Sequence, residues 1–216
     1  MSERGYVPAV GREELTRLYD PLVALTMREG SWRPELVGRL GHLGPTDLPV
    51  VDVGAGTGTF ALMIARTLPG ARVIAIDGDP EVMGIAMAKP GADRVDFRLG
   101  LATELDLPDE SAEAVIFSLV LHHLSAADKV RALEEARRVL RPEGGRLLIA
   151  DFGRPSLPTT PGFLAIRLLD GLENTRAHMR GEILDLVRGC GFREATVFDR
   201  IATVWGSLEL IEARSP

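Results

Sequence analysis

The sequence predicts an α/β protein with a mostly parallel sheet and helices on both faces. Short apolar runs alternate with segments whose apolar residues recur at helical spacing, which is the pattern of repeated strand–helix units. A glycine-rich turn joins the first apolar run to the helical segment that follows it. The last two apolar runs have no helix between them, so they must pair antiparallel.

Residues 12–43, ahead of the first strand, read as helical in pieces. Pro21 interrupts the first apolar pattern, and Ser31 is placed to cap a later piece that carries Trp32. A chain of 216 residues is the size of one domain with a full core. We therefore expect an N-terminal helical cap over residues 1–48 and a core over 49–216, in one domain overall.

The strand and helix units then follow in order. Asp79 is placed to cap the second helix with Pro80 at its first position, and Ser125 begins a capping box for the third. We expect residues 152–178 to be irregular. Strands are expected at 50–53, 72–76, 95–99, 114–119, 145–150, 193–199 and 201–212. Helices are expected at 58–68, at 80–88, from Ser125 to before Pro142, and at 179–189.

The most informative stretch is the turn after the first strand, Val50-Val51-Asp52-Val53-Gly54-Ala55-Gly56-Thr57-Gly58-Thr59. Glycine has no Cβ and tolerates positive φ, so such a turn brings bare backbone close to a ligand. The second apolar run ends in Asp77, where an acid is well placed for a ribose diol.

The glycine spacing indicates which nucleoside would bind. A dinucleotide fingerprint needs a third glycine where Thr59 stands, and a pyrophosphate prefers a helix N-terminus without a nearby acid. Asp52 and the free turn amides suit a zwitterionic amino-acid tail better. The segment resembles motif I of the class I S-adenosylmethionine-dependent methyltransferases, with Asp77 as that family's ribose-binding acid.

Three later segments strengthen the resemblance, which covers nearly everything from Pro49 onward. Residues 100–108 resemble the adenine-side segment, although Leu101 stands where many members have aspartate. Residues 113–124 resemble the segment ending in Leu-His-His-Leu, and residues 135–145 resemble a structural helix-to-strand turn. The family fold is a Rossmann-like sheet of seven strands whose last hairpin is reversed.

The resemblance implies that the cofactor binds beyond the carboxyl ends of the strands. Alternatives stay open for two residues: Leu101 could be plain core, and helical packing could explain Tyr19. The expected cofactor-binding residues are Tyr19, Asp52, Gly54, Ala55, Gly56, Gly58, Asp77, Gly78, Leu101, Ala102, Ser118 and Leu119.

Candidates for a general base are few. His122, Asp151 and His178 are the reasonable ones, and His122 and Asp151 are the predicted catalytic residues. Adjacent histidines are expected to point in different directions, so His122 and His123 make a poor metal pair and we predict no metal site. The alternatives are that both histidines anchor the helix start and that Asp151 caps a turn.

We predict methyl transfer from S-adenosylmethionine to a small or medium, hydrophobic acceptor, with apolar side chains supplied by the N-terminal segment and residues 152–178. The side chains available are Trp32, Phe152, Phe163, Leu164 and Leu168. Tyr19-Asp20 and the Leu-His-His-Leu segment resemble the ubiquinone/menaquinone C-methyltransferase branch. The alternatives are a cofactor-binding homologue that does not methylate, and an NAD-dependent oxidoreductase.

Composition narrows the kinds of partner, the cellular location and the source that we expect for the protein. The net charge of −6 and the lack of a basic run argue against a nucleic-acid partner. No apolar stretch approaches a membrane span, and Cys190 is the only cysteine, so a reducing cytoplasm is expected. All 25 basic residues except Lys89 and Lys129 are arginine, which indicates a bacterial source with a GC-rich genome. A homodimer is left open.

Overall fold

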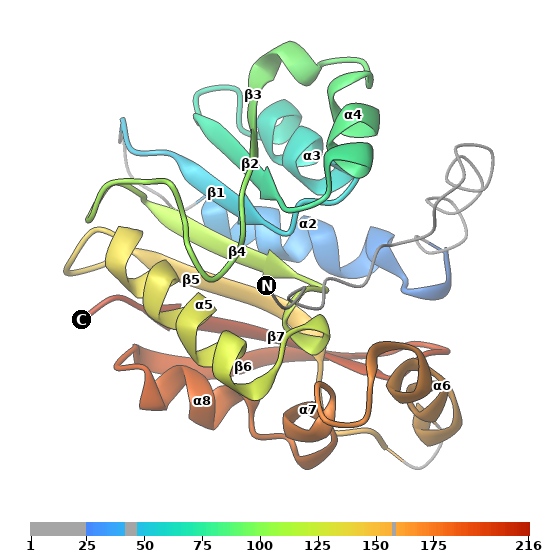
Figure 1. Ribbon diagram of the computed structural model, residues 1–216. Coiled ribbons are helices and arrows are strands. Elements are labelled where there is room, and N and C mark those ends of the chain that lie inside the picture. The colour runs from blue at the N-terminus through green and yellow to red at the C-terminus, as the bar shows by residue number, and fades with distance from the viewer. Residues whose placement is uncertain (1–24, 42–46, 157–158) are drawn as a thin grey trace, which may run out of the picture.

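The strands form one sheet in the order β3-β2-β1-β4-β5-β7-β6 (Figure 1). The computed structural model describes residues 25–41, 47–156 and 159–216. Strands β1 to β5 are parallel, and β7 lies antiparallel between β5 and β6, which confirms the predicted sheet. The bounds are β1 (Val50–Val53), β2 (Val73–Asp77), β3 (Val95–Leu99), β4 (Ala114–Ser118), β5 (Arg146–Phe152), β6 (Arg193–Ala202) and β7 (Ser207–Arg214).

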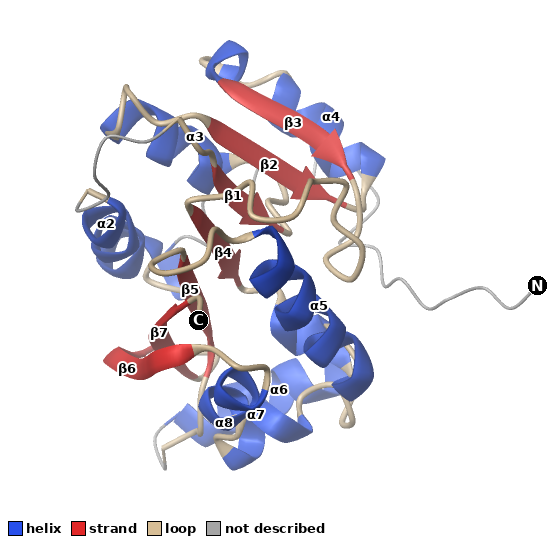
Figure 2. Ribbon diagram, turned by 90° about the vertical axis from the view of Figure 1, so that its left-hand side faces the viewer, coloured by secondary structure: helices blue, strands red, loops and turns tan. Residues whose placement is uncertain are grey.

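Helices cover both faces of the sheet, and Figure 2 shows α2 and α5 on opposite sides of it. None of the described helices is long and apolar enough to cross a membrane. The α-helices are α2 (Glu29–Leu40), α3 (Thr59–Thr67), α4 (Pro80–Met87), α5 (Ala126–Val139), α6 (Thr160–Asp170), α7 (Arg176–Arg180) and α8 (Ile183–Gly189). The short 3₁₀ turns are η1 (Ala92–Arg94) and η2 (Leu121–His123).

The sheet separates two apolar cores, because side chains alternate between the faces of a strand. Val50 belongs to the core shared with α2 and α3, whereas Val51 belongs to the core shared with α5 and α8. Trp32 of α2 packs edge-on against Phe60 of α3, with ring centroids 6.0 Å apart. The helix that precedes the sheet is therefore part of the same apolar core as α3.

Two predicted helix caps are present as expected. The Asp79 side chain accepts a hydrogen bond from Glu81 N at 2.8 Å, and Pro80 is the first residue of α4. Ser125 Oγ accepts from Asp128 N at 3.1 Å and donates to the Asp128 carboxylate at 2.7 Å. These local signals therefore set where α4 and α5 begin.

The sequence analysis predicted an irregular segment over residues 152–178. That prediction is wrong, because the segment contains α6 and most of α7. The sequence obscured α6 because it has no side-chain cap, and because Leu168 and Leu169 are exposed although they are apolar. The helix expected over 179–189 is also divided. Gly181 has a φ of 72° and ends α7 before α8 begins.

Other helix and strand boundaries differ from those expected from the sequence, for local reasons. Ser31 lies inside α2, which begins at Glu29, so Ser31 is not its cap. The last turn comes at Thr203–Gly206, where Thr203 Oγ1 accepts from Gly206 N at 3.1 Å, so β7 starts later than expected. Asp151 lies within β5 and not just beyond it. The helical pieces expected before residue 25 lie outside the described residues.

Gly162→Ala should destabilise the fold. A Cβ at Gly162 would lie 1.8 Å from the Val204 carbonyl oxygen, so α6 must move away from the β6–β7 turn. Overpacking of this kind costs about 1–3 kcal/mol. Gly84→Ala in α4 is the matched control, because a Cβ there meets nothing within 4 Å and should stabilise by up to about 1 kcal/mol. Urea unfolding of both variants measures the difference, and equal effects would contradict the tight approach of α6.

Candidate functional site

The glycine turn after β1 closes against its neighbours through backbone contacts. Gly54 N and Ala55 N both donate to Ile76 O, at 2.7 and 3.0 Å. Gly54 has a φ of 71°, and a Cβ there would lie 2.3 Å from Val120 Cγ2. Gly56 also has positive φ, but a Cβ there would meet nothing within 4 Å. The turn is therefore closed on the protein side and open above Gly56, where a ligand can approach the backbone.

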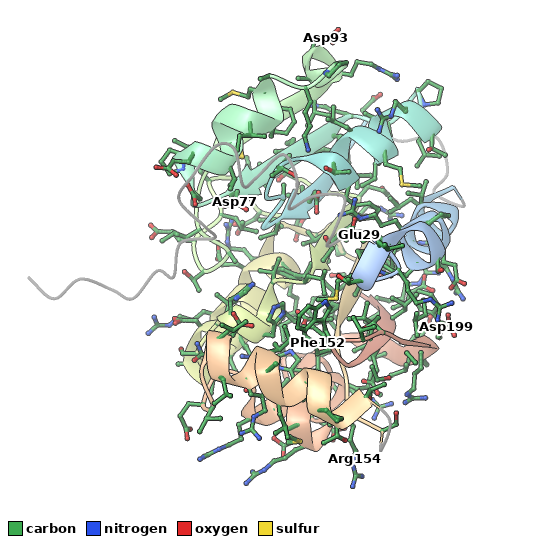
Figure 3. The ribbon with its side chains drawn as sticks, turned by 90° about the vertical axis from the view of Figure 1, so that its right-hand side faces the viewer. Glu29, Asp77, Asp93, Phe152, Arg154 and Asp199 are labelled. Carbon is green, nitrogen blue, oxygen red and sulfur yellow. The ribbon has the colours of Figure 1, made fainter. Side chains whose placement is uncertain are left out.

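Asp77 connects this turn to the end of β2. Its Oδ2 accepts from Gly56 N at 2.7 Å, and its Oδ1 accepts from Asp79 N at 2.9 Å. Asp77 is half-buried and Gly78 beside it is exposed, and Figure 3 shows Asp77 with the other side chains. Since Asp79 caps α4, Asp77 is held by two backbone donors at the strand end and does not serve as the cap.

Asp52 lies at the start of the turn, but its side chain is fully buried in β1. Neither carboxylate oxygen has a hydrogen-bond partner among the described residues. Burial raises the pKa of Asp52 to about 7, against the opposing charge of Arg33. The predicted contact between Asp52 and a ligand would therefore need a partner brought close to this buried carboxyl group.

Leu101 and Ala102 lie beside Asp77 after β3. Gly100 N donates to Asp77 O at 3.0 Å, and a Cβ on Gly78 would lie 3.1 Å from Leu101 Cδ2. Leu101 is 55% exposed, so the alternative that it is plain core is wrong. An exposed apolar side chain next to the Asp77 strand end suits contact with a flat, apolar ligand group.

The backbone after β4 forms the opposite wall. Ser118 and Leu119 are half-buried, and Leu119 has a left-handed φ of 58° while its N–H donates to Ala150 O. β4 pairs with β1 on one side and with β5 on the other. The predicted residues thus gather at the carboxyl ends of four adjacent strands, although Asp52 points into the interior. They are Asp52, Gly54, Asp77, Ser118, Leu119 and Asp151.

Asp151 organises the part of this edge where the sequence places the acceptor. Oδ2 accepts from Leu121 N at 2.7 Å and from Val120 N at 3.1 Å, and Oδ1 accepts from His122 Nδ1 at 2.8 Å. Burial alone would raise the pKa of Asp151, but the charge and hydrogen bond of His122 hold it below its usual range. With its oxygens occupied, Asp151 is an orienting group and not a free base.

His122 and His178 both lie against Asp151, so the three predicted acid–base candidates form one cluster. Because the carboxylate can only accept, His122 donates from Nδ1, and in the neutral form of the ring this leaves the lone pair on Nε2. His178 Nε2 lies 3.6 Å from Asp151 Oδ1, and burial lowers the pKa of His178 to about 3. His178 is therefore neutral at physiological pH.

His123 departs from the sequence expectation. The His122 and His123 rings do not point apart; their centroids are 4.0 Å apart and both approach Asp170 at the end of α6. Sequence reasoning missed Asp170, because the segment that carries it was expected to be irregular. Its position before Gly171 at a helix end was the available signal.

Several residues expected near the acceptor do not line a surface. Trp32, Phe152 and Phe163 are fully buried in the core, and Phe152 packs on Phe163 with ring centroids 5.4 Å apart. Leu164 and Leu168 are exposed on α6. Tyr19 lies outside the described residues.

Comparison with known proteins identifies the fold and the family. A family model described as "Methyltransferase domain" matches residues 50–144, from the glycine turn through α5. The solved structure of a SAM-dependent methyltransferase from Thermotoga maritima superposes with a TM-score of 0.67 at 22% identity, covering 94% of this chain and 97% of that one.

Curated relatives give closer sequence matches. A malonyl-acyl-carrier-protein O-methyltransferase from Methylococcus capsulatus is 32% identical over 176 residues, covering 81% of this chain and 61% of that protein. The chain spans about half the length of several other relatives. A ubiquinone/menaquinone biosynthesis C-methyltransferase from Syntrophotalea carbinolica is 30% identical over 184 residues, covering 75% of each chain. With its glycine turn, strand order and reversed hairpin, this chain belongs to the class I S-adenosylmethionine-dependent methyltransferase family.

Proposed function

We propose that this chain transfers the methyl group of S-adenosylmethionine to a small or medium-sized, hydrophobic acceptor. The observation that carries the proposal is the glycine turn held to Asp77 through Gly56 N and open above Gly56. The free turn amides expected from the sequence are not present, because the Gly54, Ala55, Gly56 and Gly58 amides already donate within the protein. What the turn offers a nucleoside is bare backbone above Gly56 and the Asp77 carboxylate beside it. The family to which the chain belongs supplies the choice of nucleoside.

Each part of the cofactor has proposed partners at this edge. Asp77 accepts from the ribose hydroxyls, and Gly78, Leu101 and Ala102 contact the adenine. The methionine end lies against the turn Gly54, Ala55, Gly56 and Gly58 and against Ser118 and Leu119. Its ammonium group would favour the ionised form of Asp52, whose pKa burial otherwise raises. Tyr19 is proposed to cover the cofactor from the N-terminal cap.

The reaction needs no protein nucleophile, because the sulfonium carries its own leaving group. An acceptor lone pair attacks the methyl carbon in line, the carbon–sulfur bond breaks, and its electron pair stays on sulfur in S-adenosylhomocysteine. Alignment of the two reactants supplies up to about 7–11 kcal/mol of such a barrier. Where the acceptor must lose a proton, His122 Nε2 offers a lone pair, with Asp151 fixing its tautomer.

A hydrophobic acceptor is supported by the exposed leucines of α6 and the loop after it. Three of them, Leu164, Leu168 and Leu169, lie on α6, the helix that carries Asp170, and Leu172 follows that helix. Each of the four is at least 46% exposed. The two relatives described above are named for O-methylation and for C-methylation, so they leave the acceptor atom open. Cofactor binding without methylation and NAD-dependent oxidoreduction are the competing proposals.

The first experiment is calorimetric titration with S-adenosylhomocysteine, with NAD in a parallel titration. We expect micromolar binding of S-adenosylhomocysteine and none of NAD, because the site lacks the third glycine of a dinucleotide turn. Binding of NAD alone would overturn the proposal. A protein that binds S-adenosylhomocysteine but methylates nothing in a screen of phenols, amines and acidic carbon acids would favour the non-methylating alternative.

Asp77→Ala should weaken S-adenosylhomocysteine binding by about 1.5–3 kcal/mol, the scale of hydrogen bonds to a charged group. Asp93→Ala is the control, since Asp93 is exposed in η1 and should leave affinity unchanged. Thermal unfolding shows whether the turn survives the loss of the bond from Gly56 N. Unchanged affinity in a folded Asp77→Ala variant would remove Asp77 from the site.

His122→Ala and Asp151→Asn should separate the acceptor end from the cofactor end. We expect His122→Ala to leave S-adenosylhomocysteine affinity nearly unchanged. Asp151→Asn should weaken S-adenosylhomocysteine binding and lower the free energy of unfolding by about 1–3 kcal/mol, because Asn keeps only one acceptor oxygen for the donors that the two carboxylate oxygens now share. Calorimetry and urea unfolding measure both effects. A large loss of affinity in His122→Ala would place that ring against the cofactor instead.

A further inference from the structure

His122, His123 and Asp170 bring three metal-ligand atoms together at the acceptor end of the site. His123 Nδ1 lies 3.1 Å from Asp170 Oδ1, and His122 Nε2 lies 3.8 Å from Asp170 Oδ2. One ligand atom from each residue lies within 4.8 Å of the other two. The longer separation exceeds a hydrogen bond, so His122 Nε2 does not donate to Asp170.

Asp151 prepares His122 for coordination. Histidines that bind metals almost always donate their other ring N–H to a carboxylate or carbonyl, which fixes the tautomer and the ring orientation. His122 Nδ1 meets Asp151 Oδ1 at 2.8 Å, and the Nε2 atom faces the Asp170 side. A buried carboxylate–histidine pair aimed at a second carboxylate is the arrangement of a metal ligand with its supporting group.

The backbones that carry the three ligands are also connected. The Asn174 side chain donates to His123 O and to Asp170 O, both at 3.0 Å. Lys129 Nζ donates to Leu124 O and to Asn174 O, which joins the start of α5 to the same loop. These bonds hold η2 and the end of α6 in one relative position, as a preorganised site requires.

The charge around the three ligands favours a cation. Asp151 and Asp170 bring two negative charges close to His123, and Lys129 brings one positive charge. The ligand side chains become more exposed from His122 (6%) to Asp170 (12%) to His123 (52%), so an ion can enter from the His123 side.

We propose that His122, His123 and Asp170 bind one divalent transition-metal ion. Two atoms that each lie about 2.0–2.2 Å from one ion are at most about 4.4 Å apart, so the separations of 3.1 and 3.8 Å to Asp170 accommodate one ion, and binding would hold the two histidine nitrogens within that same distance. Two imidazoles and one carboxylate suit Zn²⁺, Fe²⁺, Co²⁺ or Ni²⁺ better than Mg²⁺ or Ca²⁺. Three protein ligands leave coordination positions for water or, if the proposed function holds, for an acceptor oxygen or nitrogen. With an ion bound, His122 Nε2 is a ligand and no longer a general base, and the ion would instead favour loss of a proton from the group it binds.

The test is titration of the untagged, chelator-treated full chain with Zn²⁺ by calorimetry and with Co²⁺ by visible absorption. We expect one ion per chain and cobalt bands typical of nitrogen and oxygen ligands. His123→Ala and Asp170→Asn should each weaken binding at least about tenfold, and Asp151→Asn about 10–100-fold through the orientation of His122. Asp185→Asn is the control, because its exposed carboxylate lies on α8 near Arg188 and should have no effect.

Two results would overturn the metal site: no saturable binding of one ion, or equal binding by wild type, His123→Ala and Asp170→Asn. His123 is half-exposed, so its replacement should not prevent folding, and circular dichroism checks this. S-adenosylhomocysteine is titrated into the same metal-free and metal-loaded samples. Cofactor binding without metal binding rejects the metal site alone, and metal binding without cofactor binding rejects the proposed function alone.

Discussion

The buried carboxylate of Asp151 is the constraint on which the acceptor end of the molecule depends. An isolated buried charge is very costly, so this carboxylate requires several donors at once. Its donors are the backbone N–H groups after β4 and the His122 ring, and these bonds hold the segment after β4 in one conformation. The left-handed backbone at Leu119 is tolerated because these contacts over-determine it. The same bond decides which nitrogen of His122 faces outward.

The cofactor end is built differently, from backbone geometry with little side-chain charge. Gly54 and Ala55 donate to the end of β2, and Gly56 donates to Asp77, so the turn is fixed by the strand beside it. The turn after β1 meets the segment after β4 at Gly54, where a Cβ would lie 2.3 Å from Val120 Cγ2. The turn after β1 and the segment after β4 are thus neighbours because those strands pair directly.

Much of the fold follows from local signals in the sequence. Asp79 before Pro80 and Ser125 before Asp128 mark helix starts through bonds made within one turn, so they act wherever the segment lies. The glycine turn after β1 and the position of Asp77 at the end of β2 were likewise predictable, because each directly adjoins a strand in the sequence. α6 was not, because its side facing the core offers mainly Phe163 while Leu168 and Leu169 remain exposed.

The sequence by itself determined the order of the strands, the helices as far as α5, the reversed hairpin, the glycine turn and the acids at strand ends. These features depend on residues close together in the chain and on the period of their apolar positions. Only the tertiary structure decided that Asp170 meets His122 and His123, that Leu101 is exposed, and that Trp32 and Phe152 are core. Those outcomes depend on how segments far apart in the chain pack, and no local pattern encodes that the end of α6 meets η2.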